Sequence, residues 1–388
     1  MSAPVLRLSV PLPRLVGPAE VLAGEGALVA LRTLPAARVA VVATERAARS
    51  PALQRWLENP GPFEVRHLTP SWSGEPAFDA LSGTVGELAD YGPDWIVAVG
   101  GGSVLDGAKL CWARYEHPRF PVERLSRPFA LPRLRAKARF VAVPTTSGTG
   151  SENSSAAVFV DTQSGHKVPV VTHDFLPDIT VLEPRLTSGL SVRWTVLTAL
   201  DALAHALEGR VSTLTNPLVD GLAESSAIDI VTGLTRFLSE GDGLEVRGRL
   251  QIAAFHAGQV QNLRLVGVAH AIAHQLGKWH VPHAVAIGVL LPIGMEEAMR
   301  ADSVRAVYDR IGRACGLEDG RALAGAIAGL RDRAGLPNRL GEATGVPSSI
   351  ADDDVERLTG MALSDPIARF MPVKMQPDEL AGLIRRAW

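Results

Sequence analysis

The sequence predicts an α/β domain with a parallel sheet at residues 1–185, followed by an all-helical domain at residues 186–388. In the first half, short apolar runs end in polar or glycine-rich turns and alternate with segments of helix length. This pattern is typical of a parallel sheet with crossover helices. From Thr187 onward, apolar residues recur at helical spacing and strand-like runs become scarce. We therefore expect a domain boundary near residue 185.

Apolar runs in the first half predict the strands of this sheet. Three of them are expected to be buried strands: Val39–Ala43, Trp95–Val99 and Phe140–Val143. The segments between these runs suit right-handed crossovers. Two further runs, 156–160 and 167–171, flank a turn sequence at 161–165, and they predict a hairpin attached to the sheet.

Helical periodicity predicts a series of helices in the second half. They span residues 195–210, 216–239, 245–275, 284–299, 302–315, 320–334 and 352–363. Asn216-Pro217 and the glycine-rich stretch at 241–243 predict breaks between neighbouring helices.

Composition excludes several classes of protein. The chain has 388 residues, enough for two domains of about 100–200 residues each, and its hydrophobic fraction of 46% argues against disorder. A net charge of -2 gives no basic field, so we expect no nucleic-acid partner. No run reaches the roughly 18 apolar residues of a membrane span, and residues 1–16 lack the apolar run of a signal peptide. With two cysteines a disulfide framework is excluded, which favours a cytoplasmic location.

Two polar loops follow two of the predicted strands. The first, Gly100–Asp106, leads into a helix, and such glycine-rich turns bring backbone N–H groups close to a phosphate. The second, Pro144–Glu152, is rich in Thr, Ser and Gly, which suit phosphate and ribose oxygens. Because α/β sheets bind ligands at the carboxyl ends of their strands, the pair predicts a dinucleotide-binding domain. A tight turn and a flexible polar loop are the alternatives, since the spacing is not G-x-G-x-x-G.

One carboxylate and several imidazoles gather in the second half of the chain. They belong to Asp201, His205, His270, His274, His280 and His283. The first two residues are four apart, as are the third and fourth, so each pair lies on one face of a helix. A carboxylate with three imidazoles suits a divalent transition metal, either Fe(II) or Zn(II). A cluster of neutral histidines bonded to helix carbonyls is the alternative.

These stretches together resemble the iron-containing (group III) alcohol dehydrogenase family, which has the dehydroquinate synthase-like fold. The resemblance runs in order from the first predicted strand to about Pro292. The segments Ala113–Pro118 and Trp279–His283 look like the alcohol dehydrogenase half of bifunctional aldehyde–alcohol dehydrogenases.

The resemblance implies a role for each matching residue. The metal ligands fall on Asp201, His205, His270 and His283. His274 falls on the histidine beside the reacting carbon, a member of the proton path. Contacts to the cofactor fall on Gly101, Gly102, Ser103, Asp106, Thr145, Thr146, Thr149 and Lys167. Glu45 falls where the family often carries an acidic residue, which accepts from the ribose 2′-OH and repels a 2′-phosphate, so NADH is favoured over NADPH.

The activity implied is the reversible reduction of a small aldehyde to a primary alcohol by NADH or NADPH. The metal acts as a Lewis acid on the aldehyde oxygen, and the nicotinamide supplies a hydride. His274 or a water chain then delivers the proton. The resemblance also suggests a homodimer, which nothing in the sequence decides.

The chain departs from the family pattern in two places. Gln259–Arg264 is polar where the family has an apolar stretch that lines the substrate pocket, and Gln261 falls where an aromatic is common. Ile367–Lys374 replaces the family's Cys-Thr-x-x-Asn-Pro-Arg motif.

These departures predict an unusual substrate. Arg264, Arg369 and Lys374 are expected to meet around the pocket, and a buried arginine needs an anionic partner. We therefore hypothesise an aldehyde with an acidic group, such as phosphonoacetaldehyde, bound bidentately. The alternative is that these side chains face solvent or form salt bridges with local acids.

Three other functions are compatible with parts of the pattern. One is a metal-independent maleylacetate reductase-like enzyme, but such an enzyme would not need the intact set of four metal ligands. A dehydroquinate synthase-like lyase shares the fold but has a different ligand pattern. A non-catalytic metal- or nucleotide-binding protein would bind without oxidising NADH.

Overall fold

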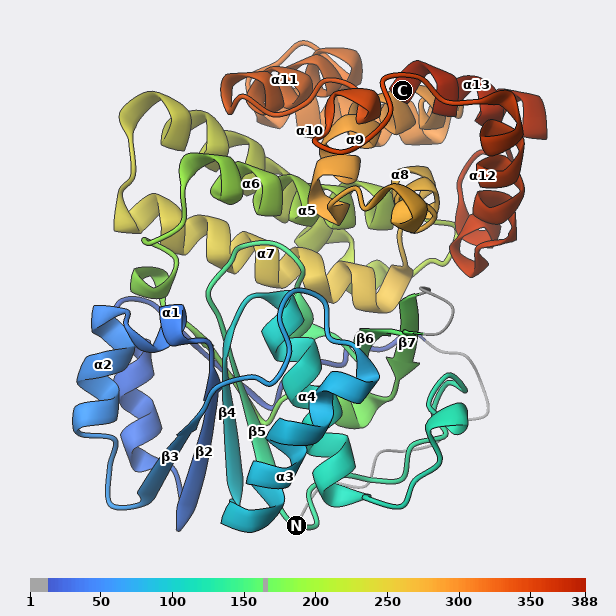
Figure 1. Cartoon of the computed structure of the whole chain (residues 1–388). Coiled ribbons are helices and arrows are strands. Elements are labelled where there is room, and N and C mark those ends of the chain that lie inside the picture. Colours follow the sequence, from blue (N-terminus) through green and yellow to red (C-terminus); the bar gives the residue numbers. More distant parts are fainter. Residues whose placement is uncertain (1–12, 163–166) are drawn as a thin grey trace.

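The first half of the chain is built on a six-stranded parallel sheet with the order β1-β8-β5-β4-β2-β3 (Figure 1). The structure, a computed structural model, describes residues 13–162 and 167–388. The strands are β1 (Glu20–Ala23), β2 (Arg38–Ala43), β3 (Glu64–Leu68), β4 (Trp95–Gly100), β5 (Arg139–Pro144) and β8 (Ile179–Leu182). The expected α/β fold is confirmed, and β2, β4 and β5 are the three strands that the sequence predicts.

Helices cover both faces of this sheet, which explains why its central strands are apolar throughout. Ile96 and Ala98 of β4 pack into the core formed with α3 (Ser82–Tyr91) and α4 (Gly102–Glu116). Val97 and Val99, which alternate with them, pack on the opposite face. That face is covered by the 3-10 helix η1 (Ala27–Thr33) and by α2 (Pro51–Glu58), which is preceded by the short α1 (Glu45–Ala48).

The hairpin predicted at residues 156–171 is present. Strands β6 (Ala156–Val160) and β7 (Lys167–Val171) pair antiparallel, whereas their predicted attachment to the main sheet is wrong because they form a sheet of their own. The reason is that the hairpin packs on α4, which already covers that face of the main sheet. Residues 163–165 of the predicted turn, like residues 1–12, lie outside the described residues.

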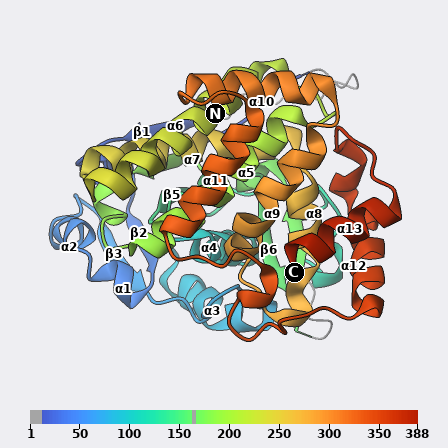
Figure 2. The same ribbon diagram turned by 90° about the horizontal axis from the view of Figure 1, so that it is seen from above.

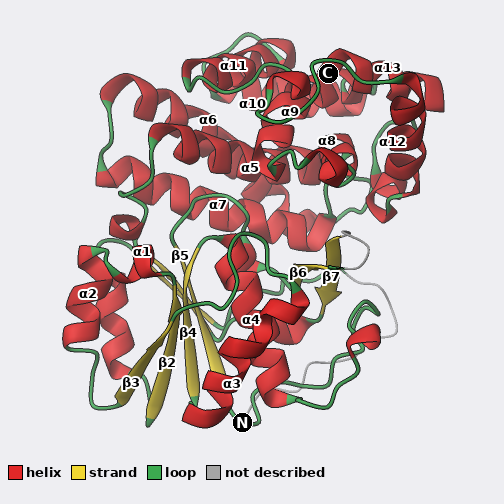
Figure 3. Ribbon diagram, viewed as in Figure 1, coloured by secondary structure: helices red, strands yellow, loops and turns green. Residues whose placement is uncertain are grey.

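Helices make up the second half, which lies beyond one end of the sheet (Figures 1 and 3). They are α5 (Val192–Val211), α6 (Asp220–Glu240), α7 (Leu244–Arg264), α8 (Val268–Ala273), α9 (His283–Ala298), α10 (Asp302–Ala314), α11 (Gly320–Arg333), α12 (Asp352–Ser364) and α13 (Pro377–Ala387). Seen from above, α10, α11 and α9 lie over α5 (Figure 2). Within the described residues, no helix is both long and apolar enough to cross a bilayer. The boundary at residue 185 stays a prediction.

The single helix predicted at 245–275 is wrong, because α7 ends at Arg264 and α8 begins at Val268. Leu265 has a φ of 62°, which ends the helical path. Gly267 follows, and a Cβ there would lie 2.9 Å from a carboxylate oxygen of Glu208. The break therefore comes from a contact with α5 that periodicity cannot show.

Candidate metal and cofactor site

The two polar loops meet at the carboxyl ends of the neighbouring strands β4 and β5. A Cβ added to Gly102 would lie 2.7 Å from Thr149, and one added to Gly101 would lie 3.4 Å from Thr146. No larger side chain fits at Gly102, so the loops approach closely only because glycine is there. Helix α4 begins at Gly102, which places its first backbone N–H groups beside this contact.

The second loop also contacts the helical half. A Cβ on Gly148 would lie 2.7 Å from Thr198 of α5, and one on Gly150 would lie 2.4 Å from Gly258 of α7. Gly150 also has a φ of 65°, a conformation that favours glycine. Thr198 precedes Asp201 by less than one turn of α5. The predicted cofactor loops and the predicted metal ligands are thus brought to one place.

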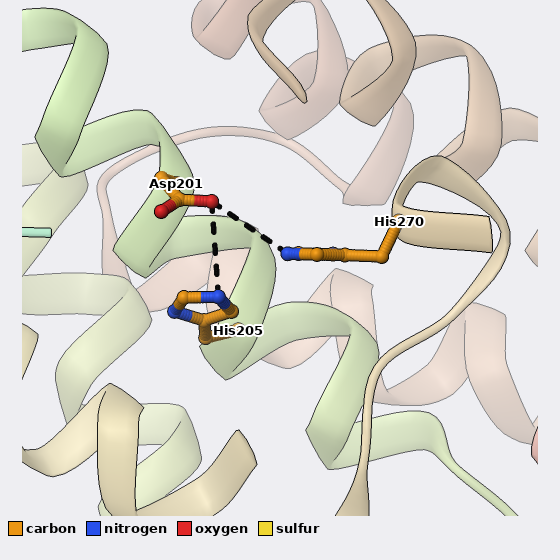
Figure 4. A group of neighbouring side chains, drawn as sticks. All are labelled: Asp201, His205 and His270. Carbon is orange, nitrogen blue, oxygen red and sulfur yellow. Dashed lines mark ion pairs between the residues drawn. The ribbon is translucent and has the colours of Figure 1, made fainter. Parts of the chain in front are cut away.

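Three imidazoles, from α5, α8 and α9, converge on one carboxylate oxygen of Asp201. Asp201 Oδ1 lies 3.7 Å from His205 Nε2, 3.6 Å from His270 Nε2 and 3.5 Å from His283 Nε2. Figure 4 shows the first three residues pointing toward one another from two segments of the chain. His205 and His270 are buried, whereas the His283 side chain keeps 27% of its exposure.

This arrangement fits a divalent metal. The buried atoms Asp201 Oδ1 and His270 Nε2, which face each other, have no hydrogen-bond partner among residues 13–162 and 167–388, which is costly for polar atoms. One ligand atom from each of Asp201, His205 and His270 lies within 4.8 Å of the others. Ligands placed about 2.0–2.2 Å from a tetrahedral metal lie roughly 3.3–3.6 Å from one another, close to the separations found here.

Burial and mutual charge perturb the pKa values of this cluster. Burial acts to raise the pKa of Asp201, but the histidines hold it well below its usual range. Burial lowers the pKa of His205 to about 4. His270 is different: burial opposes its charge, yet Asp201 and Glu208 raise its pKa to about 9. The site therefore already favours positive charge beside Asp201.

Glu208 of α5 holds His270 from the side opposite Asp201. Its Oε2 accepts from His270 Nδ1 at 2.6 Å and from Gly267 N at 3.0 Å, and its Oε1 accepts from Ala269 N at 2.7 Å. Because the carboxylate accepts at Nδ1, Nε2 is left free to face Asp201. Burial acts to raise the pKa of Glu208, but the bond from His270 lowers it, so the carboxylate is ionised.

His274 lies at the end of α8, beside the cluster. Its ring stacks on His283 with centroids 5.8 Å apart, and its Nδ1 lies 3.0 Å from Oδ2 of Asp365. Burial acts to raise the pKa of Asp365, but the bonds from His274 and from the N–H of Ile367 hold it below its usual range. The carboxylate therefore accepts from the imidazole.

Comparisons with known proteins show which family the chain belongs to. Sequence models of two families match the chain: the iron-containing alcohol dehydrogenase model covers residues 18–184, and the model of the Fe-containing alcohol dehydrogenase C-terminal region covers residues 195–388. The NADPH-dependent butanol dehydrogenase of Clostridium saccharobutylicum is 31% identical over 300 residues, 76% of each chain. The chain belongs to the iron-containing alcohol dehydrogenase family.

Two further relatives support this membership. The bifunctional aldehyde-alcohol dehydrogenase AdhE of Escherichia coli is 36% identical over 216 residues, 53% of this chain and 24% of its own length. The iron-containing alcohol dehydrogenase of Thermococcus thioreducens superposes with a TM-score of 0.84 at 27% identity, over 96% of this chain and 99% of its own. This dehydrogenase is thus an oxidoreductase of the alcohol and aldehyde class, and its family implies iron and NAD(P).

Three of the residues predicted to contact the cofactor already have partners within the protein. Asp106 accepts from Ser151 Oγ and, at 3.0 Å, from the N–H of Val158, so it ties the second loop to the hairpin. Lys167 pairs with Glu75 at the surface. Glu45, at the start of α1, accepts from Thr69 Oγ1 at 3.1 Å and pairs with Arg49, and its side chain is 63% exposed. Ser103 and Thr145 lie half-buried at the carboxyl ends of β4 and β5.

The buried Arg264 needs no substrate anion, contrary to the prediction. The buried guanidinium of Arg264 pairs with Asp220 and donates to the carbonyls of Ser212 at 2.9 Å and Leu214 at 3.2 Å. The premise that Arg264 lacks a partner is wrong, and the local salt bridge explains its burial. Arg369 and Lys374 are exposed and have no ion pair or side-chain bond with the described residues.

The polar stretch before α8 is also mostly structural. Gln259 donates to the carbonyl of Val16 at 3.3 Å, and Asn262 accepts from the N–H of Ser155 at 2.9 Å. Gln261, which is half-buried, makes no side-chain hydrogen bond with residues 13–162 or 167–388. The amide nitrogen of Asn262 is also without a hydrogen-bond partner among the described residues, although its oxygen is bonded.

Two residues of the site were missed by the sequence analysis. Glu208 follows His205 by three positions and therefore shares its helical face with Asp201, a signal that the spacing could have shown. Asp365 lies 91 positions from His274, and no local pattern links the two.

Proposed function

We propose that this dehydrogenase reversibly reduces a small aldehyde to a primary alcohol with NADH, using a divalent metal held by Asp201, His205, His270 and His283. The observation that carries the proposal is the pair of buried, unpartnered ligand atoms Asp201 Oδ1 and His270 Nε2. Asp201 lies less than one helical turn from Thr198, which contacts the cofactor loop. When bound, the metal supplies Lewis acidity and the reduced nicotinamide supplies a hydride.

The residues of the chain bind, orient and move a proton. Glu208 fixes the ring of His270, and burial of His205 excludes water from that side of the site. Gly101 and Gly102 let the cofactor phosphates approach the start of α4. His274 keeps 39% of its side-chain exposure, which allows it to exchange a proton with solvent and pass it to the substrate oxygen.

Glu45 supports NADH as the preferred cofactor. It lies just beyond β2, whose last residue Ala43 pairs with Val99 at the start of the glycine loop. Its exposed carboxylate would bond a ribose 2′-OH and repel a 2′-phosphate. Glu45→Gln should therefore lower the kcat/KM ratio of NADH over NADPH. Glu58→Gln, an exposed glutamate of α2, serves as the matched control and should leave the ratio unchanged.

The cations Arg369 and Lys374 favour an anionic aldehyde, such as phosphonoacetaldehyde, as the substrate. Both cations belong to the segment that Asp365 ties to His274, and neither has an ion-pair partner among the described residues. Arg369→Ala and Lys374→Ala should each lower the kcat/KM ratio of phosphonoacetaldehyde over acetaldehyde. Arg264→Ala should leave that ratio unchanged because Asp220 already pairs with its guanidinium. A parent enzyme that prefers acetaldehyde would contradict the anionic substrate.

One experiment tests the reaction itself. Metal analysis is combined with NADH and NADPH oxidation across neutral and anionic aldehydes, before chelation, after chelation and after Fe(II) or Zn(II) is restored. Activity that is lost on chelation and returns with metal supports the proposal. Full activity of the metal-free protein would favour the maleylacetate reductase-like alternative. No turnover with any aldehyde after metal is restored would contradict the proposed function.

A further inference from the structure

Asp365 joins two distant segments at the edge of the proposed active site. It lies between α12 and the 3-10 helix η10 (Pro366–Phe370), and its side chain is 11% exposed. Its Oδ2 accepts from His274 Nδ1 at 3.0 Å and from Gln275 Nε2 at 3.2 Å, whereas Oδ1 accepts from the N–H of Ile367 at 3.0 Å. Gln275 and Ile367 thus hold both carboxylate oxygens, independently of the bond from the imidazole.

This contact decides which nitrogen of His274 is available. A carboxylate only accepts hydrogen bonds, so Nδ1 of His274 carries a hydrogen and Nε2 is the nitrogen left for other chemistry. Nε2 has no hydrogen-bond partner in the part of the chain that the structure describes. The stacked ring of His283, tilted by only 17°, fixes the plane of the His274 imidazole from its face. Asp365 therefore sets the rotation of the ring, and His283 sets its plane.

We propose that Asp365 is a positioning residue that holds the Nδ1 edge of His274, so that Nε2 is the nitrogen the ring presents to the substrate. This inference rests on the proposed function. Reduction adds a hydride and a proton to the carbonyl group. A ring held in this way keeps its Nδ1 hydrogen bonded to Asp365, and Nε2 is the nitrogen that can contact the substrate oxygen or a water beside it.

A double-mutant cycle separates this role from simple support of the fold. Asp365→Ala should lower kcat by about 10- to 100-fold, as loss of an orienting partner does in other sites, and leave KM for NADH unchanged. Asp365→Asn should recover part of the loss, because the amide oxygen still accepts from Nδ1. In a His274→Ala background, Asp365→Ala should change kcat no further, because both residues act through the same ring.

The controls address the other bonds of Asp365. Gln275→Ala removes its second side-chain donor and should leave kcat unchanged. Metal content and Tm are measured for every variant, and the solvent deuterium isotope effect on kcat should rise in Asp365→Ala as proton transfer becomes limiting. If Asp365→Ala lowers kcat equally in the parent and in the His274→Ala background, or if its loss of kcat follows metal content or Tm, the inference about Asp365 is overturned and the proposed function still stands. A parent enzyme inactive on every aldehyde would overturn the proposed function, and this inference with it.

Discussion

The Glu208 carboxylate accepts a 2.6 Å hydrogen bond from His270 Nδ1 and also receives the N–H groups of Gly267 and Ala269. One side chain of α5 therefore fixes both the start of α8 and the ring that α8 carries. The ligand and the backbone that presents it are oriented together.

Replacement of Glu208 should weaken metal binding. In Glu208→Gln the amide is neutral, and it can receive fewer of the three hydrogen bonds, so His270 is oriented less firmly. We expect the metal affinity to fall by about 10- to 100-fold, measured by competition with a chelator. Glu297→Gln, which changes a glutamate that pairs with Arg300 at the surface, should keep the parent affinity. Equal affinities for all three proteins would show that Glu208 does not orient the ligand.

The contact between Gly148 and Thr198 should tolerate no methyl group. In Gly148→Ala the new Cβ would lie 2.7 Å from the Cβ of Thr198 and 2.9 Å from its carbonyl oxygen, so α5 or the loop must move. We expect a loss of about 1–3 kcal/mol in the free energy of unfolding, together with weaker NADH binding. Thermal unfolding and fluorescence titration measure the two effects. Gly189→Ala, where no atom lies within 4 Å, should change neither.

Arg264 should matter for stability. Arg264→Ala removes an ion pair with Asp220 and leaves the carbonyls of Ser212 and Leu214 without their donor. Because Asp220 keeps 36% of its exposure and can recover water, we expect a loss of about 2–3 kcal/mol, below that of a fully buried pair. Chemical denaturation measures it. Arg249→Ala, whose pair with Asp229 is exposed, should cost less than about 1 kcal/mol. A parent-like Arg264→Ala variant would show that the pair contributes little.

The free energy of unfolding should fall as the pH drops below the usual pKa of histidine, about 6.5, and His173 should contribute to this loss. Burial, and then Arg14, lowers its pKa. Arg14 donates to Nε2 at 2.5 Å, so the folded protein holds this ring neutral. The unfolded chain therefore binds the proton more readily, and the stability that His173 contributes is present above pH about 6.5 and lost as pH falls through the lower folded pKa.

The measurement compares the Tm of the parent and of His173→Gln between pH 5 and 7.5. The parent should lose Tm more steeply toward pH 5. His256 also has a pKa lowered mainly by burial, so His256→Gln serves as a second reference for the slope. Parallel curves for the parent and His173→Gln would contradict the assignment.

The sequence was sufficient to predict the features that depend on a few neighbouring residues. The run Trp95–Val99 and the glycines after it identify a buried strand and its loop, because both depend on neighbouring residues. The strands β1 and β3 are partly exposed, and β8, although apolar, is only four residues long, so their apolar signals are weaker than those of β2, β4 and β5. The partner of Arg264 lies 44 positions away and that of His274 lies 91 positions away. The sequence shows the charge of Arg264 but not its partner, which suggested an anionic substrate, whereas the fold supplies the carboxylate of Asp220.

The division of the proposed metal ligands between α5 and the stretch from α8 to α9 has a consequence for the stability of the protein. The long antiparallel pair of α6 and α7 separates the two segments in the chain, so an ion bound to both acts as a cross-link across that insertion. Binding energy of the ion then contributes to folding energy. Metal-free protein should consequently be cleaved by proteases between α7 and α9 faster than metal-bound protein. The supply of the metal would then limit how much of the enzyme persists as well as how fast it works.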